Sequence, residues 1–247
     1  MAIKDIMSKE IYKYKKFNTE FSLPYRVYYP AGYSSDTEKK FPLLFFLHGH
    51  GECGTDNEKQ LGVLGKPNIL LEQVAEDNKC IILAPQCPCE PLDHEWVAIN
   101  HRWHLCSREK LPKKPTTALA ASTELLRSFI KKNRVDTSRV YIAGISMGGY
   151  GSWEMITRHP KLFAAAIILC GAGFPSYAAR LKNISIWAFH GLKDGTVLPS
   201  GTKDMESALI SVGGNIKATY FENIGHDVWD AAFSTEGLTE WLYSKSK

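Results

Sequence analysis

A serine between two glycines is the residue of this sequence best suited to covalent chemistry. Gly144-Ile-Ser146-Met147-Gly148 has the form G-x-S-x-G and directly follows the apolar run 140–143. A sharp strand-to-helix turn of this form holds a serine in a strained backbone conformation and lifts its hydroxyl clear of the sheet. A helix begins directly after the serine. Its free N-terminal amides and its dipole stabilise negative charge at the reaction centre. The motif therefore predicts Ser146 as a nucleophile for acyl transfer and the N–H of Met147 as a donor to the oxyanion.

Two loops later in the chain carry the partners that such a serine needs. A serine hydroxyl attacks well only when an imidazole takes its proton, and a carboxylate must hold that imidazole in the right tautomer. Asp194 follows the predicted strand 184–189, and His226 follows the predicted strand 218–221. Loops at the carboxyl ends of parallel strands meet at one edge of the sheet. Because the order serine, acid, histidine is also the order expected for this turn, we predict Asp194 as the acid and His226 as the base.

The acid has two rivals beside the histidine. Asp227 and Asp230 adjoin His226 in sequence, but neither stands in the loop where the acid is expected. Asp230 is instead predicted to be the N-cap of the final helix, because an aspartate side chain accepts hydrogen bonds from the first amides of a helix. Two further histidines, His48 and His190, stand at strand ends before glycine and are predicted to hold loops by hydrogen bonds.

The glycine-rich loop after the predicted strand 41–47 admits two interpretations. Small residues let a backbone N–H point into the site, so the amide of His50 is the predicted second oxyanion donor. Gly49-His-Gly51-Glu-Cys-Gly54 also fits the dinucleotide fingerprint G-x-G-x-x-G of a nicotinamide-linked oxidoreductase. That alternative needs an apolar-faced helix after the last glycine and an acidic residue after the next strand, and the sequence has neither.

Short apolar runs alternate with helical patterns along most of the chain. Continuous bulky runs predict strands buried on both faces at 41–47, 80–84, 140–143, 164–169, 184–189 and 218–221. An early, more exposed strand at 24–29 is expected to pair with 11–17. Apolar stripes predict helices at 116–132, 150–158, 200–212 and 231–243. The alternation predicts an α/β fold with a mostly parallel central sheet and helices on both of its faces.

The segment 85–115 breaks this alternation. It is rich in Pro, Cys, His and Trp and lacks a clear period. A connection of this length is usually functional, so we predict a substrate-facing insert within a single domain that spans 1–247. No internal repeat or linker divides the chain.

The six cysteines are too few for a disulfide scaffold in 247 residues. A single bridge from Cys87 or Cys89 to Cys106 is left open, because both ends lie in one loop-like region. Cys87-Pro-Cys89 is too close for a zinc C-x-x-C pair, and the nearest histidines have no ligand spacing. The sequence therefore predicts no metal site and no cofactor.

Composition and charge exclude several other classes of protein. A hydrophobic content of 44% and a charged content of 23% are ordinary for a globular chain. The net charge of +4 comes from lysines near the two ends, so no nucleic-acid surface is expected. No apolar window reaches the roughly 18 to 20 residues that span a bilayer, so no membrane partner is expected. The start carries charges where a signal peptide needs its apolar core, which fits a cytoplasmic protein or a secreted one whose signal has been removed. The oligomeric state is not determined.

Six short motifs spread over nearly the whole chain belong together. They are His48-Gly-His-Gly-Glu52, Thr55-Asp-Asn57, Ala84-Pro-Gln-Cys-Pro88, Gly144-Ile-Ser-Met-Gly-Gly149, His190-Gly-Leu-Lys-Asp194 and Gly225-His-Asp-Val-Trp229. With them the chain resembles the α/β-hydrolase superfamily, and within it the compact carboxylesterases that include feruloyl and acetylxylan esterases and a group of predicted peptidases. The resemblance implies an oxyanion N–H from His50 and an aromatic near the substrate at Trp96. The chain departs from these relatives at Cys53, where they carry arginine, and in a longer insert at 93–115.

The predicted activity is that of a serine carboxylesterase. Its substrates would be small acyl, feruloyl or acetyl esters, either free or attached to plant cell-wall polysaccharide. Trp96, Trp103 and Trp229 are the predicted substrate-binding residues and would form an aromatic wall; the alternative is that they pack as core or rim residues. The alternatives are a serine peptidase that uses the same three residues and a non-catalytic binding protein on a hydrolase scaffold. A binding protein has no need of a serine, an acid and a histidine at all three positions, which argues against the second alternative.

Overall fold

The computed structural model of the protein describes residues 2–16, 19–99, 102 and 110–247. The predicted substrate residue Trp103 and the predicted disulfide partner Cys106 lie outside the described residues. Within the described ranges, no helix has both the length and the apolar character that a membrane crossing requires.

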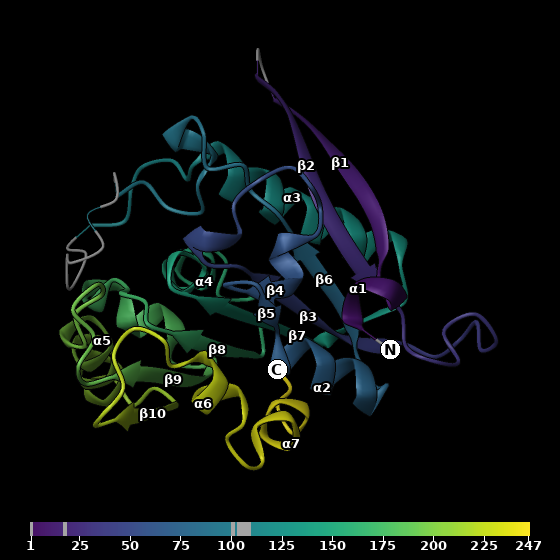
Figure 1. The fold of residues 1–247 in the computed structure, drawn as a ribbon. Coiled ribbons are helices and arrows are strands. Elements are labelled where there is room, and N and C mark those ends of the chain that lie inside the picture. Colours follow the sequence, from purple (N-terminus) through teal and green to yellow (C-terminus); the bar gives the residue numbers. More distant parts are fainter. Residues whose placement is uncertain (1, 17–18, 100–101, 103–109) are drawn as a thin grey trace.

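An eight-stranded sheet forms the centre of the molecule (Figure 1). Its strands are β1 (Ser8–Lys16), β2 (Thr19–Tyr28), β3 (Phe41–Leu47), β6 (Ile81–Pro85), β7 (Val135–Ile145), β8 (Ala165–Leu169), β9 (Ser185–Gly191) and β10 (Ile216–Phe221). They lie in the order β1-β2-β6-β3-β7-β8-β9-β10. The pairs β1–β2 and β2–β6 are antiparallel, and the other pairs are parallel. The predicted mostly parallel sheet is confirmed, as is the early pairing of Ile11 with Pro24.

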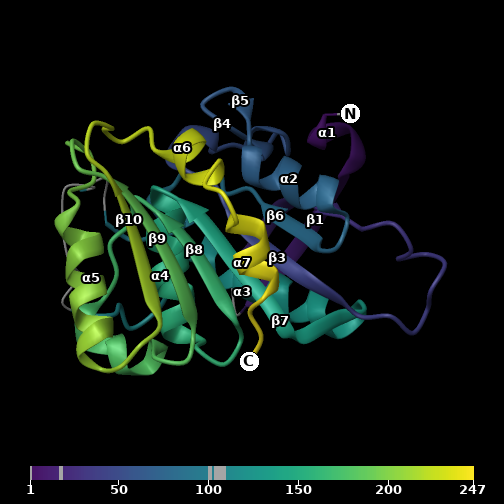
Figure 2. The same cartoon turned by 90° about the horizontal axis from the view of Figure 1, so that it is seen from below.

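Helices cover both faces of this sheet (Figure 2). One layer holds α3 (Thr117–Lys132), α4 (Met147–Arg158) and α5 (Ser200–Ser211), and the other holds α2 (Ile69–Asp77), α6 (Trp229–Phe233) and α7 (Leu238–Tyr243). In β3, where all seven residues are buried, Phe45 packs toward the first layer, and Leu44 and Phe46 pack toward the second. This alternation is the period-two pleat of a strand with two buried faces, and it explains the continuous apolar runs in the sequence.

The prediction of one helix at 231–243 is wrong in detail, because the structure has two short helices there, α6 and α7. Gly237, with φ of +75°, occupies the left-handed region immediately before α7. Trp229 opens α6 after Val228, so Asp230 lies inside that helix and is not its N-cap. The break lets each helix bury its own apolar side against the sheet. The nine-residue helix α2 was not predicted.

The strand order reverses at β3, because β6 lies on one side of it and β7 on the other. In open α/β sheets, ligands bind beyond the carboxyl ends of the strands at such a reversal. Leu47 of β3 pairs with Gly144 of β7, so the loop that begins at His48 lies beside the turn at Ser146. The topology therefore brings the predicted oxyanion loop and the predicted nucleophile to one place.

Among the residues that the structure describes, a disulfide joins Cys53 to Cys89. Cys87 is a buried free cysteine. The sequence left open a bridge from Cys87 or Cys89 to Cys106, and the structure shows neither, because Cys89 pairs with Cys53 and Cys87 is free. The pairing spans 36 residues of sequence and arises because β3 and β6 are neighbours, so the loops after them lie side by side.

Candidate active site

Ser146 forms the turn between β7 and α4 with φ of 53° and ψ of −114°. A positive φ is sparsely populated for a residue with a Cβ and costs about 1–3 kcal/mol, so it persists only where the surrounding structure enforces it. The amide of Ser146 donates to the carbonyl of Leu169 at 2.9 Å, which ties the turn to β8. The side chain of Ser146 remains partly exposed at the edge of the sheet.

Two glycines make room for this turn. A Cβ on Gly144 would lie 2.2 Å from the carbonyl oxygen of Gly148, and a Cβ on Gly148 would lie 2.0 Å from the carbonyl oxygen of Leu47. Both obstructing atoms belong to backbone, which cannot swing aside as a flexible side chain can. The spacing G-x-S-x-G is therefore required by the close approach of β7, α4 and the end of β3.

Gly148→Ala is expected to lower the free energy of unfolding by about 3 kcal/mol or more, because the added methyl group forces the backbone of α4 away from Leu47. Gly195→Ala is the matched control, since a Cβ there meets nothing within 4 Å. Urea unfolding followed by circular dichroism measures both variants. Equal stability of the two variants would show that the approach of the chains at Gly148 is not tight.

His226 lies in the loop after β10 and links the serine to an acid. Its Nε2 is 2.9 Å from Oγ of Ser146, and its Nδ1 is 2.7 Å from Oδ2 of Asp194. The imidazole is mostly buried, with 21% of its side chain exposed. The structure thus brings together the three side chains that the sequence analysis singled out, from loops after three different strands. The geometry allows a proton to pass from the hydroxyl to the ring while the carboxylate holds the other ring nitrogen.

Asp194 is buried and fully engaged in hydrogen bonds. Its Oδ1 accepts from the amides of Thr196 and Val197, each at 2.9 Å, and its Oδ2 lies 3.3 Å from Nε2 of His190. Burial raises the pKa of Asp194, but the hydrogen bonds to His190 and His226 outweigh it and hold that pKa well below its usual range. The carboxylate therefore stays ionised at neutral pH.

The two rival acids lie elsewhere. Asp227 and Asp230 are both exposed, and the carboxylate of Asp230 faces Lys66 at 3.5 Å. The Nδ1 of His226 is engaged by Asp194 instead. His190 was predicted to hold a loop by hydrogen bonds. Its ring nitrogens lie 2.7 Å from Oγ1 of Thr202 and 2.9 Å from the carbonyl oxygen of Val197, in agreement with that role.

The predicted oxyanion donors flank the serine. Met147 is the first residue of α4, and the first hydrogen bond of this helix runs from the amide of Tyr150 to the carbonyl of Ser146. The amide of Met147 therefore has no acceptor within the helix and points beyond its N-terminus. His50 opens a short 3₁₀ turn, His50–Glu52, and lines the same cavity as Ser146. The next α-helix along the chain, α2, begins only at Ile69, so no α-helix opens directly after Gly54 as a dinucleotide-binding loop requires.

A cavity of about 260 Å³ opens beside Ser146 and His226. Its other lining residues are Gly49, His50, Gly51, Glu52, Val63, Leu64, Ile145, Thr196, Asp227 and Trp229. Val63 and Leu64 belong to a small hairpin, β4 (Gly62–Val63) and β5 (Lys66–Pro67), that the sequence analysis missed. The buried carboxylate of Glu52 accepts the amide of Leu64 at 2.8 Å and fixes this wall. Gly65 in the turn and Pro67 at the end of β5 were the signal that could have revealed the hairpin.

The predicted aromatic wall is only partly present. The ring of Trp229 lies 5.6 Å from that of His226 at 89°, and Trp229 borders the cavity. Trp96 is completely buried, with its ring 5.1 Å from that of His48. The prediction that Trp96 contacts the substrate is therefore wrong, because this side chain fills the core beside α4. Trp103 lies outside the described residues.

His48 is a buried neutral imidazole that joins two loops. Its Nδ1 donates to the carbonyl of Gly49 at 2.6 Å, and its Nε2 accepts the amide of Cys87 at 3.1 Å. Burial lowers the pKa of His48 to about 4. Protonation would break the bond from Cys87, so the ring serves structure, as the sequence analysis predicted.

The free energy of unfolding is expected to fall as the pH drops from about 6.5 to about 4, because an unfolded histidine binds a proton in this window and the folded His48 does not. Between pH 7 and pH 4.5 this one residue accounts for about 2 kcal/mol. Urea unfolding at both pH values should show a smaller difference for His48→Gln than for the wild type. An unchanged difference would assign the acid sensitivity to other groups.

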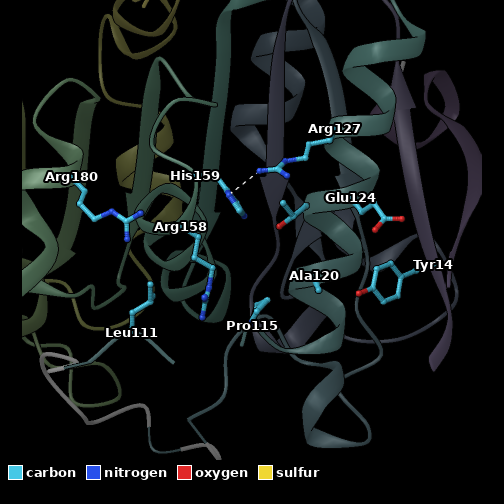
Figure 3. A pocket seen from close by; sticks show the side chains of 10 residues that line it. Tyr14, Leu111, Pro115, Ala120, Glu124, Arg127, Arg158, His159 and Arg180 are labelled. Carbon is cyan, nitrogen blue, oxygen red and sulfur yellow. Dashed lines mark hydrogen bonds between the residues drawn. The ribbon is translucent and has the colours of Figure 1, made fainter. Parts of the chain in front are cut away.

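A larger cavity of about 440 Å³ lies at the other end of α4 (Figure 3). Arg127, Arg158, His159 and Arg180 are among its lining residues. Burial and the charges of these three arginines lower the pKa of His159 to about 4, so its neutral Nδ1 accepts from Arg127 at 3.0 Å. Because Ser146 precedes α4 and Arg158 ends it, this cavity is about 18 Å from the serine and contributes nothing to its chemistry.

The strand order and the strained serine turn at the strand reversal define an α/β-hydrolase. The sequence model of the Esterase family matches residues 18–242, and the chain belongs to that family. The protein is thus a hydrolytic esterase.

Three proteins illustrate what this chain is similar to. A thermostable esterase of known structure is 31% identical, with a TM-score of 0.85 over 99% of this chain, and the chain spans 64% of that protein's length. A ferulic acid esterase is 20% identical, with a TM-score of 0.66 over 92% of this chain and 93% of its own, which shows the shared fold. Lysophospholipase-like protein 1 of Mus musculus is 21% identical over 240 residues, or 91% of this chain and 95% of the relative.

Proposed function

We propose that the protein is a serine carboxylesterase that hydrolyses small acyl esters, acetyl and feruloyl esters among them, through an acyl-enzyme. The observation that carries the proposal is the chain of two hydrogen bonds, 2.9 Å from Ser146 to His226 and 2.7 Å from His226 to Asp194. A buried carboxylate, an oriented imidazole and a strained, accessible serine together are what nucleophilic acyl transfer needs.

The reaction proceeds in two steps. The Oγ of Ser146 attacks the ester carbonyl while Nε2 of His226 takes its proton, and the proton then passes to the leaving alcohol. Water, deprotonated by the same nitrogen, attacks the acyl-enzyme and releases the acid. The amides of Met147 and His50 receive the oxyanion in both steps, and each donor of this kind is worth about 10²–10³ in rate.

The lining of the cavity supports a small acyl group. Val63, Leu64, Ile145 and Trp229 present apolar surface next to the serine, and the side chain of Leu64 is 59% exposed. Trp229 borders the cavity beside His226 and is 5% exposed, so an aromatic acyl group such as feruloyl has one aromatic side chain to contact there. The fold shared with a ferulic acid esterase is in keeping with that substrate class.

Covalent labelling tests the nucleophile. A fluorophosphonate is expected to add one equivalent to the wild-type protein, and peptide mass spectrometry is expected to find it on Ser146. A label on another residue, or none, would reject the proposal. Rates with p-nitrophenyl acetate, p-nitrophenyl octanoate, methyl ferulate and a peptide amide then rank the acyl groups, and the short and aromatic esters should be cleaved fastest.

A further inference from the structure

Three arginines line the cavity at the C-terminal end of α4 (Figure 3). Arg127 comes from α3, Arg158 ends α4, and Arg180 lies in the 3₁₀ helix η4 (Pro175–Leu181). His159, the residue after α4, lines the same cavity, and the charges of all three arginines act on its ring. We name these four residues the arginine cluster. Three elements thus bring positive charge to one cavity of about 440 Å³, a volume that suits a small organic molecule.

Only one of these arginines has an acidic partner among the described residues. Arg158 pairs with Glu154 at 2.7 Å through Nε and Nη2, which leaves Nη1 to donate elsewhere. Arg127 donates to the imidazole of His159 at 3.0 Å. Arg180 makes no hydrogen bond or ion pair within the part of the chain that the structure describes. Two guanidinium groups therefore line the cavity without a carboxylate to balance their charge.

His159 adds a hydrogen-bond donor to the cluster and no charge. Burial and the three arginine charges lower its pKa to about 4, so the ring is neutral at pH 7. Since its Nδ1 accepts from Arg127, the single ring proton is on Nε2. Within the described ranges, this Nε2 has no hydrogen-bond partner. The cluster is therefore a set of N–H donors that lacks an acceptor with negative charge.

A phosphate group matches these donors better than a carboxylate does. A carboxylate is planar and has two oxygens, so a single guanidinium group can engage both of them. A phosphate monoester has three terminal oxygens in tetrahedral directions and carries about −1.5 to −2 charge at pH 7. It can accept from donors on several elements at once, and its charge balances Arg127 and Arg180 together. Arginine is also the side chain best suited to phosphate recognition.

The rest of the cavity suits the organic part of such a ligand. Side chains with apolar surface complete the lining, namely Tyr14, Leu111, Pro115 and Ala120. The carboxylate of Glu124 lies beside Tyr14, across the cavity from Arg180 (Figure 3), and accepts from the hydroxyl of Tyr12 at 2.9 Å. Because this carboxylate repels a phosphate, the ligand is oriented with its phosphate at the arginine cluster and its organic part toward Tyr14.

We propose that the arginine cluster binds the phosphate group of a small, soluble organic phosphate monoester, whose oxygens accept from the three guanidinium groups and from Nε2 of His159. No bond in the ligand forms or breaks. The cavity is about 18 Å from Ser146, so a bound ligand does not contact the serine. The proposal is therefore independent of the proposed esterase activity.

The test is a calorimetric titration of the full chain with phenyl phosphate at pH 7.5 and low salt. One equivalent is expected to bind with a Kd below about 1 mM, because charge-assisted hydrogen bonds are the strong ones. Benzoate carries the same ring on a planar carboxylate and is expected to bind at least about tenfold more weakly. Absence of saturable phenyl phosphate binding, or equal binding of benzoate, would overturn the proposal.

Variants locate the bound phosphate. Arg127→Gln and Arg180→Gln should each weaken phenyl phosphate binding about tenfold, because each removes a charge-assisted hydrogen bond. Both substitutions change exposed side chains, and thermal melting checks that the variants fold. Lys131→Gln is the matched control, since it removes the same charge from an exposed position of α3 outside the cavity, and its affinity should stay within about twofold of the wild type. Equal affinity in all three variants would reject the cluster as the site.

A sedimentation assay separates a soluble ligand from a lipid headgroup. Phosphatidic acid presents the same phosphate monoester at a membrane surface. Vesicles of phosphatidylcholine and phosphatidic acid are expected to leave the protein in the supernatant, because the arginines line a cavity. Sedimentation of the wild type but not of Arg180→Gln, together with no phenyl phosphate binding, would assign the cluster to a lipid and overturn the proposal of a soluble ligand.

Discussion

Ser146→Ala is expected to lower kcat for ester hydrolysis by about 10⁵–10⁶-fold, the loss seen when a serine hydrolase keeps its binding site but has no nucleophile. Residual catalysis would come from the oxyanion donors and from binding, so the KM should change much less than kcat. The measurement uses p-nitrophenyl acetate at pH 8 with enzyme at high concentration, because the remaining rate is small.

Ser152→Ala is the matched control for this variant. Ser152 lies in α4, the helix that follows Ser146, and its buried hydroxyl has no hydrogen-bond partner among the described residues, so its loss should leave both activity and folding nearly unchanged. Thermal melting shows whether Ser146→Ala is folded. A folded Ser146→Ala protein with more than about 1% of wild-type kcat would show that another group attacks the ester, because a single triad residue is worth far more than a factor of 100.

Asp194→Asn is expected to reduce kcat by about 10⁴-fold while the backbone stays in place. The amide group of asparagine can donate to Nδ1 of His226, which would put the proton on Nε2 and leave that nitrogen unable to accept from Ser146. Because the pKa of Asp194 is held well below its usual range, the wild-type carboxylate stays ionised at pH 5. The variant should therefore remain slow across the whole range from pH 5 to pH 9.

Asp227→Asn distinguishes this effect from a general change of charge. Asp227 adjoins His226 in sequence and lines the same cavity, but it is exposed. Its replacement should alter kcat by less than about tenfold, as expected for a charge that solvent screens. If Asp227→Asn were the slower of the two variants, the acid would have been assigned to the wrong residue.

The turn at Ser146 was predictable because it is local. Strand, glycine, serine, glycine and helix follow one another within about twenty residues, and the atoms that leave no room for a Cβ at Gly144 belong to Gly148 and Ser152 of the helix that follows. Asp194 and His226 were predictable for a related reason. Each directly follows a strand, and parallel strands deliver their carboxyl ends to one edge of the sheet.

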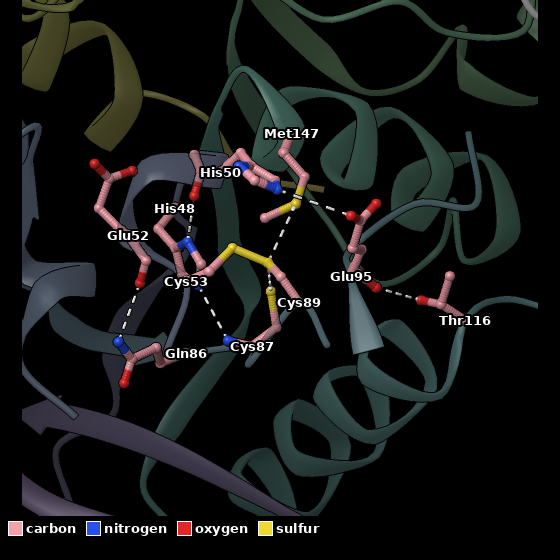
Figure 4. Close-up of a disulfide and its surroundings, with 11 residues drawn as sticks. His48, His50, Glu52, Cys53, Gln86, Cys87, Cys89, Glu95, Thr116 and Met147 are labelled. Atoms are coloured by element: carbon pink, nitrogen blue, oxygen red, sulfur yellow. Dashed lines mark hydrogen bonds and ion pairs between the residues drawn. A yellow bond between two sulfur atoms is a disulfide. The ribbon is translucent and has the colours of Figure 1, made fainter. Parts of the chain in front are cut away.

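Contacts between loops were not predictable in the same way. The bridge from Cys53 to Cys89 (Figure 4) depends on β3 and β6 becoming neighbours, and a count of cysteines carries no information about that. Trp96 lies in a segment that reads as an exposed insert, yet the space between His48 and α4 takes up its side chain. The cavity wall at Leu64 depends on the buried Glu52, twelve residues earlier, whose carboxylate accepts a hydrogen bond from the amide of Leu64.

The sequence by itself determined the class of fold and singled out the serine, the aspartate and the histidine that the structure brings together, since these follow from apolar periodicity and from the residues that end each strand. The tertiary structure alone decided which loops meet around the serine, which tryptophan borders the cavity, and which cysteines form the disulfide. The physical reason is the separation in sequence between the residues that interact. Backbone geometry and strand burial are set by neighbours in sequence, whereas the packing of one loop on another depends on the order of the strands and on the shape of the space between them.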